Sequence, residues 1–293
     1  MKKILNPIFF TLSVVVLMLS IFSCEKVIKL DLNSENPKII IEAPIDVDSS
    51  IHRITIKQTV NFDNEIGGVP VTSADVTLSN GTISVKFNHS SNGEYIATTP
   101  KDFFSSSKSY ELKVIEAGKT YTSNSSCPTV TIPLDSIGIY KQKTFGRYNY
   151  SVVALRNETP KGVPNWYQYQ AKKNGVKINK ILIDDDQNLD GVTVTRKPIF
   201  DLPEFSPDTV VNDLPKFKIE NNGIVSITDS VELELTLVNI EYKVYRYFFN
   251  LVLNQGGRQS ATPSNPDPLF TNGALGYFSV QKSYTKKKWI NTK

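Results

Sequence analysis

The feature that most constrains this fold is a succession of short segments in which apolar and polar residues alternate. In residues 51–60, for example, Ile54 and Ile56 share one face of an extended chain, because strand side chains point to opposite faces in turn. Asn80-Gly81 joins two such segments and is a strong hairpin signal. Short alternating segments with Gly, Asn and Ser between them predict an antiparallel β-sandwich. The strands expected first are 25–32, 38–43, 51–60, 69–78, 82–87, 93–98, 110–115 and 120–123.

The strand pattern breaks at the prolines between Pro128 and Pro133 and then resumes. We therefore expect a sandwich domain over residues 24–130 and a second β-rich domain over residues 131–293. Its expected strands are 136–141, 148–156, 166–172, 176–183, 230–237 and 276–281. A proline-rich stretch at 196–215 is expected to form an ordered surface loop. Lys286, Lys287, Lys288 and Trp289 are expected to form a solvated tail.

One segment has the period of a helix. In residues 240–255, Ile240, Val244, Phe248 and Leu251 recur at spacings of three and four, and Gly256-Gly257 supplies a stop. This pattern predicts one amphipathic helix whose aromatic residues face the core; the alternative is that they line a ligand groove. The fold class expected is therefore mainly β, with a transthyretin-like or immunoglobulin-like sandwich first and a β-rich domain with this helix second.

The first residues predict export and lipidation. Lys2 and Lys3 precede an apolar run over residues 8–22, which is shorter than the roughly 20 residues that span a bilayer. The run ends in Ile21-Phe22-Ser23-Cys24, so we expect residues 1–23 to be a lipoprotein signal peptide and the Cys24 thiol to accept diacylglycerol and palmitate. The alternative is an uncleaved N-terminal anchor with an incidental cysteine. Two or more acyl chains hold a protein on a membrane stably.

Charge and cysteine content exclude several classes of protein. The formal net charge of +4 includes Lys2 and Lys3, so a chain without its signal is close to neutral. That balance gives no electrostatic case for nucleic acid as a partner. With Cys24 lipidated, Cys127 is the sole remaining cysteine, so no intramolecular disulfide can form. We expect Cys127 to be a buried or half-buried small apolar residue.

Two resemblances follow from particular residues. Pro70, Ala74 and Leu78, with Gly93-Glu94-Tyr95, Tyr110-Glu111-Leu112 and 118–121, resemble the transthyretin-like or carboxypeptidase-regulatory sandwich, which implies a spacer or docking unit. The segments 24–28, 134–137, 245–247 and 272–278 resemble the Bacteroidota outer-membrane lipoprotein family named domain of unknown function 4249. The second resemblance covers essentially the whole chain after the signal. It implies an outer-membrane lipoprotein found beside TonB-dependent receptor systems, and it supplies no functional residues.

An acidic segment has half of a calcium-loop pattern. Asp186, Asn188 and Asp190 precede Gly191 at the spacing of the first ligands of an EF-hand. Position twelve is Lys197 rather than the bidentate Glu that an EF-hand needs, and no helices flank the segment. An acidic hairpin between 176–183 and 192–196, with its turn at Asp190-Gly191, is the alternative. Calcium remains a candidate cofactor because a second loop could complete its ligands.

Catalytic residues are sparse. The two histidines, His52 and His89, are far apart in the sequence, and no nucleotide-binding glycine motif is present. The first hypothesis is therefore a non-catalytic lipoprotein, accessory to an outer-membrane β-barrel. The second is a lipoprotein that captures a small ligand or glycan for a transporter, with Trp166, Tyr167 and Tyr169 as an exposed platform. Trp166 and Tyr167 fall on opposite faces of a strand, which weakens that platform. The sequence leaves open which face of the outer membrane is occupied.

We predict that Cys24→Ala abolishes lipid attachment. In cells fed a labelled fatty acid, the parent chain should carry the label and partition with membranes, whereas the variant should carry none, because the thiol is the nucleophile that accepts the lipid. Cys127→Ala is the matched control and should keep the label. Equal labelling of the Cys24→Ala variant and its parent would show that the first residues are not a lipoprotein signal.

Overall fold

The computed structural model describes residues 37–60, 68–105, 108–144, 147–157, 161–187, 195–201, 219–220, 223–224, 230–255 and 266–291. The chain divides into two compact units, Met1–Asn36 and Pro37–Lys293, and every described residue belongs to the second unit. Cys24 and the expected strand at 25–32 lie outside the described residues.

The first strands form a sandwich, as the alternating segments predict. They are β1 (Ile39–Asp46), β2 (Ile51–Gln58), β3 (Val69–Pro70), β4 (Asp75–Ser79), β5 (Ser84–Ser91), β6 (Glu94–Thr98), β7 (Ser109–Glu116) and β8 (Lys119–Ser126). β5 pairs with β4 through its first half and with β6 through its second half, so it passes from one side of the sandwich to the other. Asn80 forms the expected hairpin turn, in which its Oδ1 accepts hydrogen bonds from the backbone of Thr82 and Ile83. A continuous apolar cluster that includes Ile41, Phe87 and Tyr110 fills the space between the sheets.

The later strands form two sheets that face each other and, over residues 219–220 and 223–224, a separate two-stranded sheet. They are β9 (Ser136–Thr144), β10 (Arg147–Arg156), β11 (Trp166–Lys173), β12 (Val176–Lys177), β13 (Leu182–Asp185), β14 (Thr195–Asp201), β15 (Ile219–Glu220), β16 (Gly223–Ile224), β17 (Ser230–Ile240) and β18 (Leu275–Asn291). β14, β10 and β9 make a three-stranded sheet, and β11 pairs with β12, β13 and β17. Val152, Tyr167 and Leu235 belong to one apolar cluster between the two sheets. The protein is thus mainly β, as expected.

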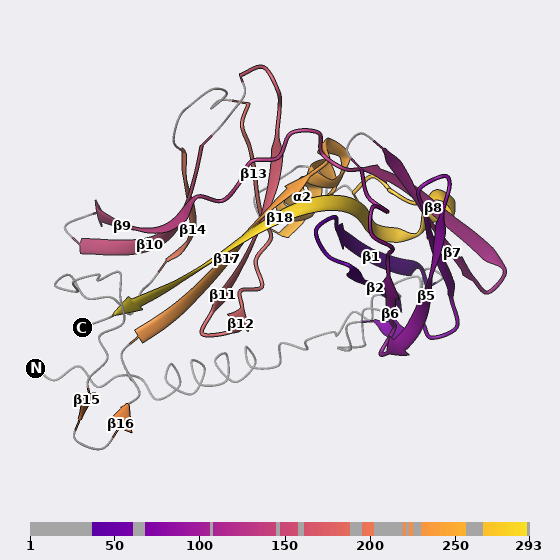
Figure 1. The fold of residues 1–293 in the computed structure, drawn as a ribbon, viewed down its shortest axis with the longest axis horizontal. Coiled ribbons are helices and arrows are strands. Elements are labelled where there is room, and N and C mark those ends of the chain that lie inside the picture. The colour runs from indigo at the N-terminus through magenta and orange to yellow at the C-terminus, as the bar shows by residue number, and fades with distance from the viewer. Residues whose placement is uncertain are drawn as a thin grey trace, which may run out of the picture. The chain divides into compact units, whose positions relative to one another are not determined.

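Strand β18 joins the two halves (Figure 1). Residues 275–281 pair in parallel with β1, and residues 282–291 pair antiparallel with β17. A single sheet therefore contains strands from both sides of the expected boundary near residue 130. The prediction of a tail at 286–289 is wrong, because these residues lie in β18, although Lys286, Lys287 and Trp289 are exposed to solvent as expected. Glu232 and Glu234 on β17 pair with Lys287 at 3.7 and 2.9 Å, which allows charged residues in a paired strand.

The helix is shorter than its pattern predicts. It is α2 (Tyr242–Gln255), since Ile240 ends β17 and the Glu241 carbonyl accepts the first helical hydrogen bonds from Val244 and Tyr245. Val244 and Phe248 pack with Val238 and Ile240 of the sheet. A 3₁₀ turn, η1 (Thr271–Gly273), precedes β18. Within the described residues, no helix is long and apolar enough to cross a membrane.

Two details of the second half differ from the sequence predictions. Residues 176–183 form β12 and part of β13, separated by a turn, rather than one strand. The predicted hairpin between 176–183 and 192–196 is wrong for the described residues, because β14 pairs with β10. Pro198 lies in β14 at the edge of its sheet, where the pairing shifts register and a missing N–H is tolerated. The rest of the proline-rich stretch, from residue 202, lies outside the described residues.

We predict that Gly276→Ala strongly destabilises the protein. Gly276 has a φ of +99°, and a Cβ there would overlap the backbone of Ile41 on the neighbouring strand. Strain and overlap together should lower the free energy of unfolding by more than about 3 kcal/mol in urea titrations. Gly118→Ala is the control: its φ is +76° but nothing lies within 4 Å of the added Cβ, so about 1 kcal/mol is expected. Equal losses would show that contact between β1 and β18 does not require glycine.

Candidate functional site

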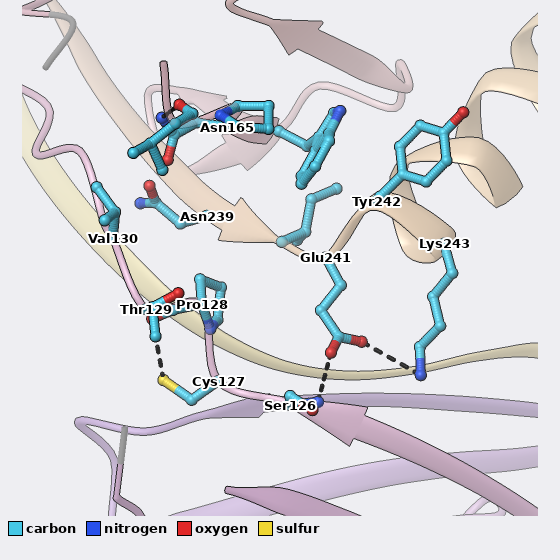
Figure 2. Close-up of a pocket in the computed structure, with 14 residues that line it drawn as sticks. Ser126, Cys127, Pro128, Thr129, Val130, Asn165, Asn239, Glu241, Tyr242 and Lys243 are labelled. Atoms are coloured by element: carbon cyan, nitrogen blue, oxygen red, sulfur yellow. Dashed lines mark hydrogen bonds and ion pairs between the residues drawn. The ribbon is translucent and has the colours of Figure 1, made fainter. Parts of the chain in front are cut away.

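A pocket with a volume of about 470 Å³ lies at the start of α2, among the described residues (Figure 2). Three segments surround it: residues 126–130 after β8, residues 163–166 before β11, and residues 239–243 where β17 becomes α2. These segments are far apart in the sequence, so the pocket exists only in the folded chain. Its volume is within the range of about 300–1,000 Å³ found for small-molecule sites.

One wall of the pocket is aromatic. The rings of Trp166 and Tyr242 lie 5.1 Å apart at an angle of 47°, and Tyr242 is 45% exposed. Pro128 and Pro164 also line the pocket and restrict its backbone. The Trp166 Nε1 atom is buried and has no hydrogen-bond partner among the described residues. This wall can therefore hold an apolar or aromatic group through its ring faces.

The amide side chains around the pocket are occupied by structural hydrogen bonds. Asn239 is buried, and its Oδ1 accepts from the Ile132 backbone N–H (2.7 Å) while its Nδ2 donates to the Ile132 carbonyl (3.0 Å). Asn165 Nδ2 donates to the Asp186 carboxylate (2.9 Å) and to the Val163 carbonyl (2.7 Å). These hydrogen bonds fix the walls of the pocket. They also leave the side-chain amides few donors and acceptors for a bound ligand.

Glu241 fastens the helix start to β8. Its Oε1 accepts a hydrogen bond from the Ser126 backbone (2.6 Å), and its Oε2 accepts from Ser125 Oγ (3.1 Å) and lies 3.2 Å from Lys243 Nζ. Ser125 Oγ in turn accepts from the Val280 backbone (2.8 Å) on β18. Figure 2 shows Glu241 between Ser126 and Lys243. Among the described residues that line this pocket, the only carboxylate is thus committed to β8 and Lys243.

Cys127 lines the pocket but is not an activated nucleophile. The side chain is half-buried and packs against the first apolar cluster, as the sequence predicts. Its Sγ lies 3.7 Å from the Pro128 carbonyl. Burial raises the pKa of the Cys127 thiol, and nearby Lys282 offsets part of that effect. Because the thiolate is the reactive form, a raised pKa keeps this cysteine protonated and unreactive near neutral pH.

Of the three aromatic residues predicted to form an exposed platform, only Trp166 reaches the pocket. Tyr167 and Tyr169 are 0% and 1% exposed, so the prediction of a shared exposed platform is wrong for these two. Alternation along β11 explains the difference: Trp166 faces α2, whereas Tyr167 and Tyr169 face the three-stranded sheet.

Tyr167 and Tyr169 surround a buried cation. Arg156 is 0% exposed, and its guanidinium lies 4.4 Å from the centre of the Tyr167 ring. It donates to Asp184 (3.0 Å) and to Tyr169 Oη. Lys197 of β14 also contacts Asp184, at 2.8 Å. This network ties β10, β13 and β14 together around paired charges, which is how buried charges are retained in a core.

The acidic segment does not gather its carboxylates around one point. Asp184 binds Arg156, Asp185 accepts from Tyr245 Oη (2.6 Å), and Asp186 is 2% exposed and accepts from the Asn165 backbone (2.9 Å). Within the described ranges, no group of three or more acidic, His or Cys side chains could hold a metal ion. The other predicted calcium ligands, Asn188 and Asp190, lie outside the described residues. Of the three predicted ligands, the structure describes only Asp186, whose carboxylate accepts hydrogen bonds from Asn165.

Both histidines lie in strands of the first sandwich, His52 in β2 and His89 in β5. His52 is 2% exposed, and its Nε2 lies 3.0 Å from Thr99 Oγ1. Burial lowers the pKa of His52. His89 makes an edge contact with Tyr95, with ring centres 5.4 Å apart. Neither histidine is among the described residues that line the pocket, so those residues supply no imidazole base or acid.

Sequence reasoning missed most of the pocket. Asn239, Glu241 and Tyr242 occupy the point where the strand period of β17 changes to the helical period of α2, but the pattern over 240–255 includes Ile240 and hides that change. Apolar and polar residues stop alternating at Asn239-Ile240-Glu241, and this break could have marked the end of the strand. The contacts of these residues with residues 126–132 depend on tertiary structure and have no local signal.

We predict that Cys127 reacts slowly with alkylating agents in the folded protein. The raised pKa means that less thiolate is present at a given pH. The pH at which the rate of alkylation by iodoacetamide reaches half its maximum should therefore be higher for the folded protein than for the same chain unfolded in urea. Peptide mass spectrometry would measure the rates at Cys127. A folded-state midpoint at or below the unfolded one would indicate an activated thiol and would reopen a catalytic role for the pocket.

Comparison with known proteins places the chain in a family. A search of curated proteins found no match. The family model described as Domain of unknown function (DUF4249) matches residues 25–287, which includes all of the pocket and every described strand except the last residues of β18. Because the match covers most of the sequence, this chain belongs to the DUF4249 family.

Proposed function

We propose that this protein is a lipid-anchored, non-catalytic lipoprotein of the outer membrane that acts as an accessory subunit of a β-barrel protein related to TonB-dependent receptors. The export signal ending at Cys24 supports the anchor. The resemblance of residues 70–121 to the transthyretin-like sandwich, a spacer or docking unit, favours a docking role.

The observation that carries this proposal is the state of the polar groups around the pocket. Asn165, Asn239 and Glu241 are each held by hydrogen bonds to other parts of the fold, and the Cys127 thiol is kept protonated. A catalytic site needs a base, an acid or a nucleophile poised near the reacting atoms. This pocket instead has rigid walls and an aromatic surface, which are properties of a binding site.

The shape of the pocket suits a side chain on a partner loop. Trp166 and Tyr242 offer ring faces, and buried aromatic anchors dominate the binding energy of protein interfaces. Because Tyr242 is 45% exposed, it can contact a partner without opening the core. An apolar or aromatic residue on a loop of the barrel is the group that we expect in the pocket.

Capture of a small ligand or glycan is the second candidate. It is favoured by one observation, the cavity of about 470 Å³ beside Trp166, because sugar rings stack on exposed aromatic faces and the size fits a small molecule. In this alternative the transporter would receive the ligand from the lipoprotein, and the pocket would be occupied without a partner protein.

We predict that Tyr242→Ala weakens association with the barrel. When the tagged, lipidated protein is purified from native membranes in mild detergent, the parent should recover one barrel protein. The variant should recover at least about tenfold less, since loss of a central aromatic anchor typically costs about 2 kcal/mol or more. Val176→Ala, at a 71% exposed position on β12, is the control and should recover the barrel normally.

Three readings complete this experiment. Thermal unfolding of both variants checks that Tyr242→Ala is folded. Barrel recovery that is unchanged by Tyr242→Ala would contradict docking through the pocket. If the parent recovers no barrel but gains thermal stability with an oligosaccharide, and Trp166→Ala abolishes that gain, ligand capture is the function instead.

A further inference from the structure

Helix α2 has apolar residues on two opposite faces. Val244 and Phe248 face the sheet and are buried. At 3.6 residues per turn, Tyr242, Phe249 and Leu253 lie within about 40° of one another on the outward side. Tyr242, Phe249, Val252 and Leu253 are 45%, 39%, 36% and 48% exposed, and they form a large share of the exposed large apolar side chains in the described residues. We call these four residues, with the half-buried Tyr245, the outward face.

Polar residues occupy only one flank of the helix. Lys243, Arg246, Asn250 and Asn254 fall together between the outward face and the core face. No acidic residue occurs in residues 242–255. Lys243 pairs with Glu241 (3.2 Å), and the Arg246 guanidinium lies 6.0 Å from the Tyr242 ring centre. Lys243 also donates to the Asn124 carbonyl, so Arg246 is the cation of this flank that the fold does not tie to another element in the described contacts. A helix that is apolar on its solvent side, with one polar flank and no acidic residue, can lie at a membrane surface.

Most of the outward face is ordered without help from a partner. The rings of Tyr242, Tyr245 and Phe249 stack in sequence, with centres 6.5 and 6.0 Å apart. Tyr245 Oη is fixed to Asp185 at 2.6 Å, which places one carboxylate at the edge of this face. That carboxylate opposes attraction to anionic headgroups, so insertion of apolar side chains must supply most of the contact.

The small size of the outward face beyond Tyr242 argues against a separate protein partner at Phe249, Val252 and Leu253. A 14-residue helix is about 21 Å long and about 10 Å wide, which offers a few hundred Å² at most. A stable protein interface buries roughly 800 Å² on each partner. A contact of this size is sufficient only as a second attachment, when another element already holds the protein nearby.

The lipid proposed on Cys24 is the attachment that would hold the protein near the membrane, and the length of the segment between Cys24 and β1 limits its reach. Twelve residues, 25–36, separate Cys24 from the first described residue, and an extended chain of that length reaches at most about 40 Å. Lys38 and Ile39 then enter β1, whose partner β18 carries Tyr277, and that ring packs against Phe248 of α2 at 4.9 Å. A lipid on Cys24 would therefore keep α2 within reach of the bilayer.

We propose that the outward face of α2 lies on the phospholipid bilayer, with Phe249, Val252 and Leu253 inserted at the boundary between headgroups and acyl chains. This inference rests on the proposed lipid anchor at Cys24, which supplies the first attachment. The helix supplies the second attachment and fixes which side of the protein faces the membrane. The pocket, which shares Tyr242 with this face, then opens close to the membrane surface.

The test uses tryptophan as a depth reporter. Phe249→Trp in the full lipidated protein is added to vesicles of phosphatidylethanolamine and phosphatidylglycerol that carry brominated acyl chains. We expect its fluorescence to be quenched at least about twofold more than that of the parent, which reports only Trp166 and Trp289. Val176→Trp is the matched control, because it is exposed and lies on β12, away from α2; its added signal should not be quenched.

The outcomes separate this inference from the proposed anchor. Mass spectrometry of the same sample shows whether Cys24 carries lipid. Lipid on Cys24 without quenching of the Phe249→Trp reporter would overturn the membrane contact and leave the anchor intact, and protection of α2 from hydrogen exchange only when a barrel is present would assign this face to a protein. Quenching without lipid would support the helix and overturn the anchor. Absence of both would overturn both proposals.

A second variant tests the apolar contact itself. Leu253→Ser on the Phe249→Trp background removes one inserted side chain, and it should reduce quenching because less apolar area enters the bilayer. Asn254→Ser, on the polar flank, should leave the quenching unchanged. Equal quenching in the Leu253→Ser variant and its parent would show that the outward face is not inserted.

Discussion

The structure depends on the pairing of β18 with two different partners. Its first half lies parallel to β1, where Phe278 and Val280 enter the first apolar cluster, and its second half lies antiparallel to β17, where Ile290 enters the second. Because β1 and β17 both pair with β18, the sheet that contains strands of both halves is incomplete until β18 is in place. Parallel pairing of residues so distant in the sequence is slow to form, so we infer that docking of β18 is a late step in folding.

The sequence predicted the elements with a local signal. The hairpin at Asn80, the limits of β11 and the opposite directions of Trp166 and Tyr167 all follow from turn chemistry and the two-residue period. Strand β18 was recognised only in part, because Lys286–Lys288 interrupt its apolar pattern. Of these lysines, Lys287 pairs with Glu232 and Glu234 on β17, and cross-strand pairing of this kind cannot be read from one segment alone.

The acidic segment shows why the candidate site was harder to predict. A calcium loop and a set of structural hydrogen bonds draw on the same kinds of oxygen-bearing side chains, and of the predicted calcium ligands only Asp186 lies among the described residues. In the fold, Asp184, Asp185 and Asp186 turn to three different partners, Arg156, Tyr245 and Asn165. The directions alternate because the segment ends a strand, and the partners come from distant positions. The spacing of acidic residues therefore carries little information until the neighbouring elements are known.

The pocket and the outward face of α2 meet at one residue, Tyr242. Its ring packs against Trp166 in the pocket wall and also begins the stack with Tyr245 and Phe249. Any partner side chain that displaces the ring from Trp166 must also disturb that stack, since aromatic pairs lose their favourable geometry when the rings shift. Binding in the pocket and contact along the helix are therefore coupled through a single side chain, and the sign of the coupling depends on whether both occupants accept the same ring position.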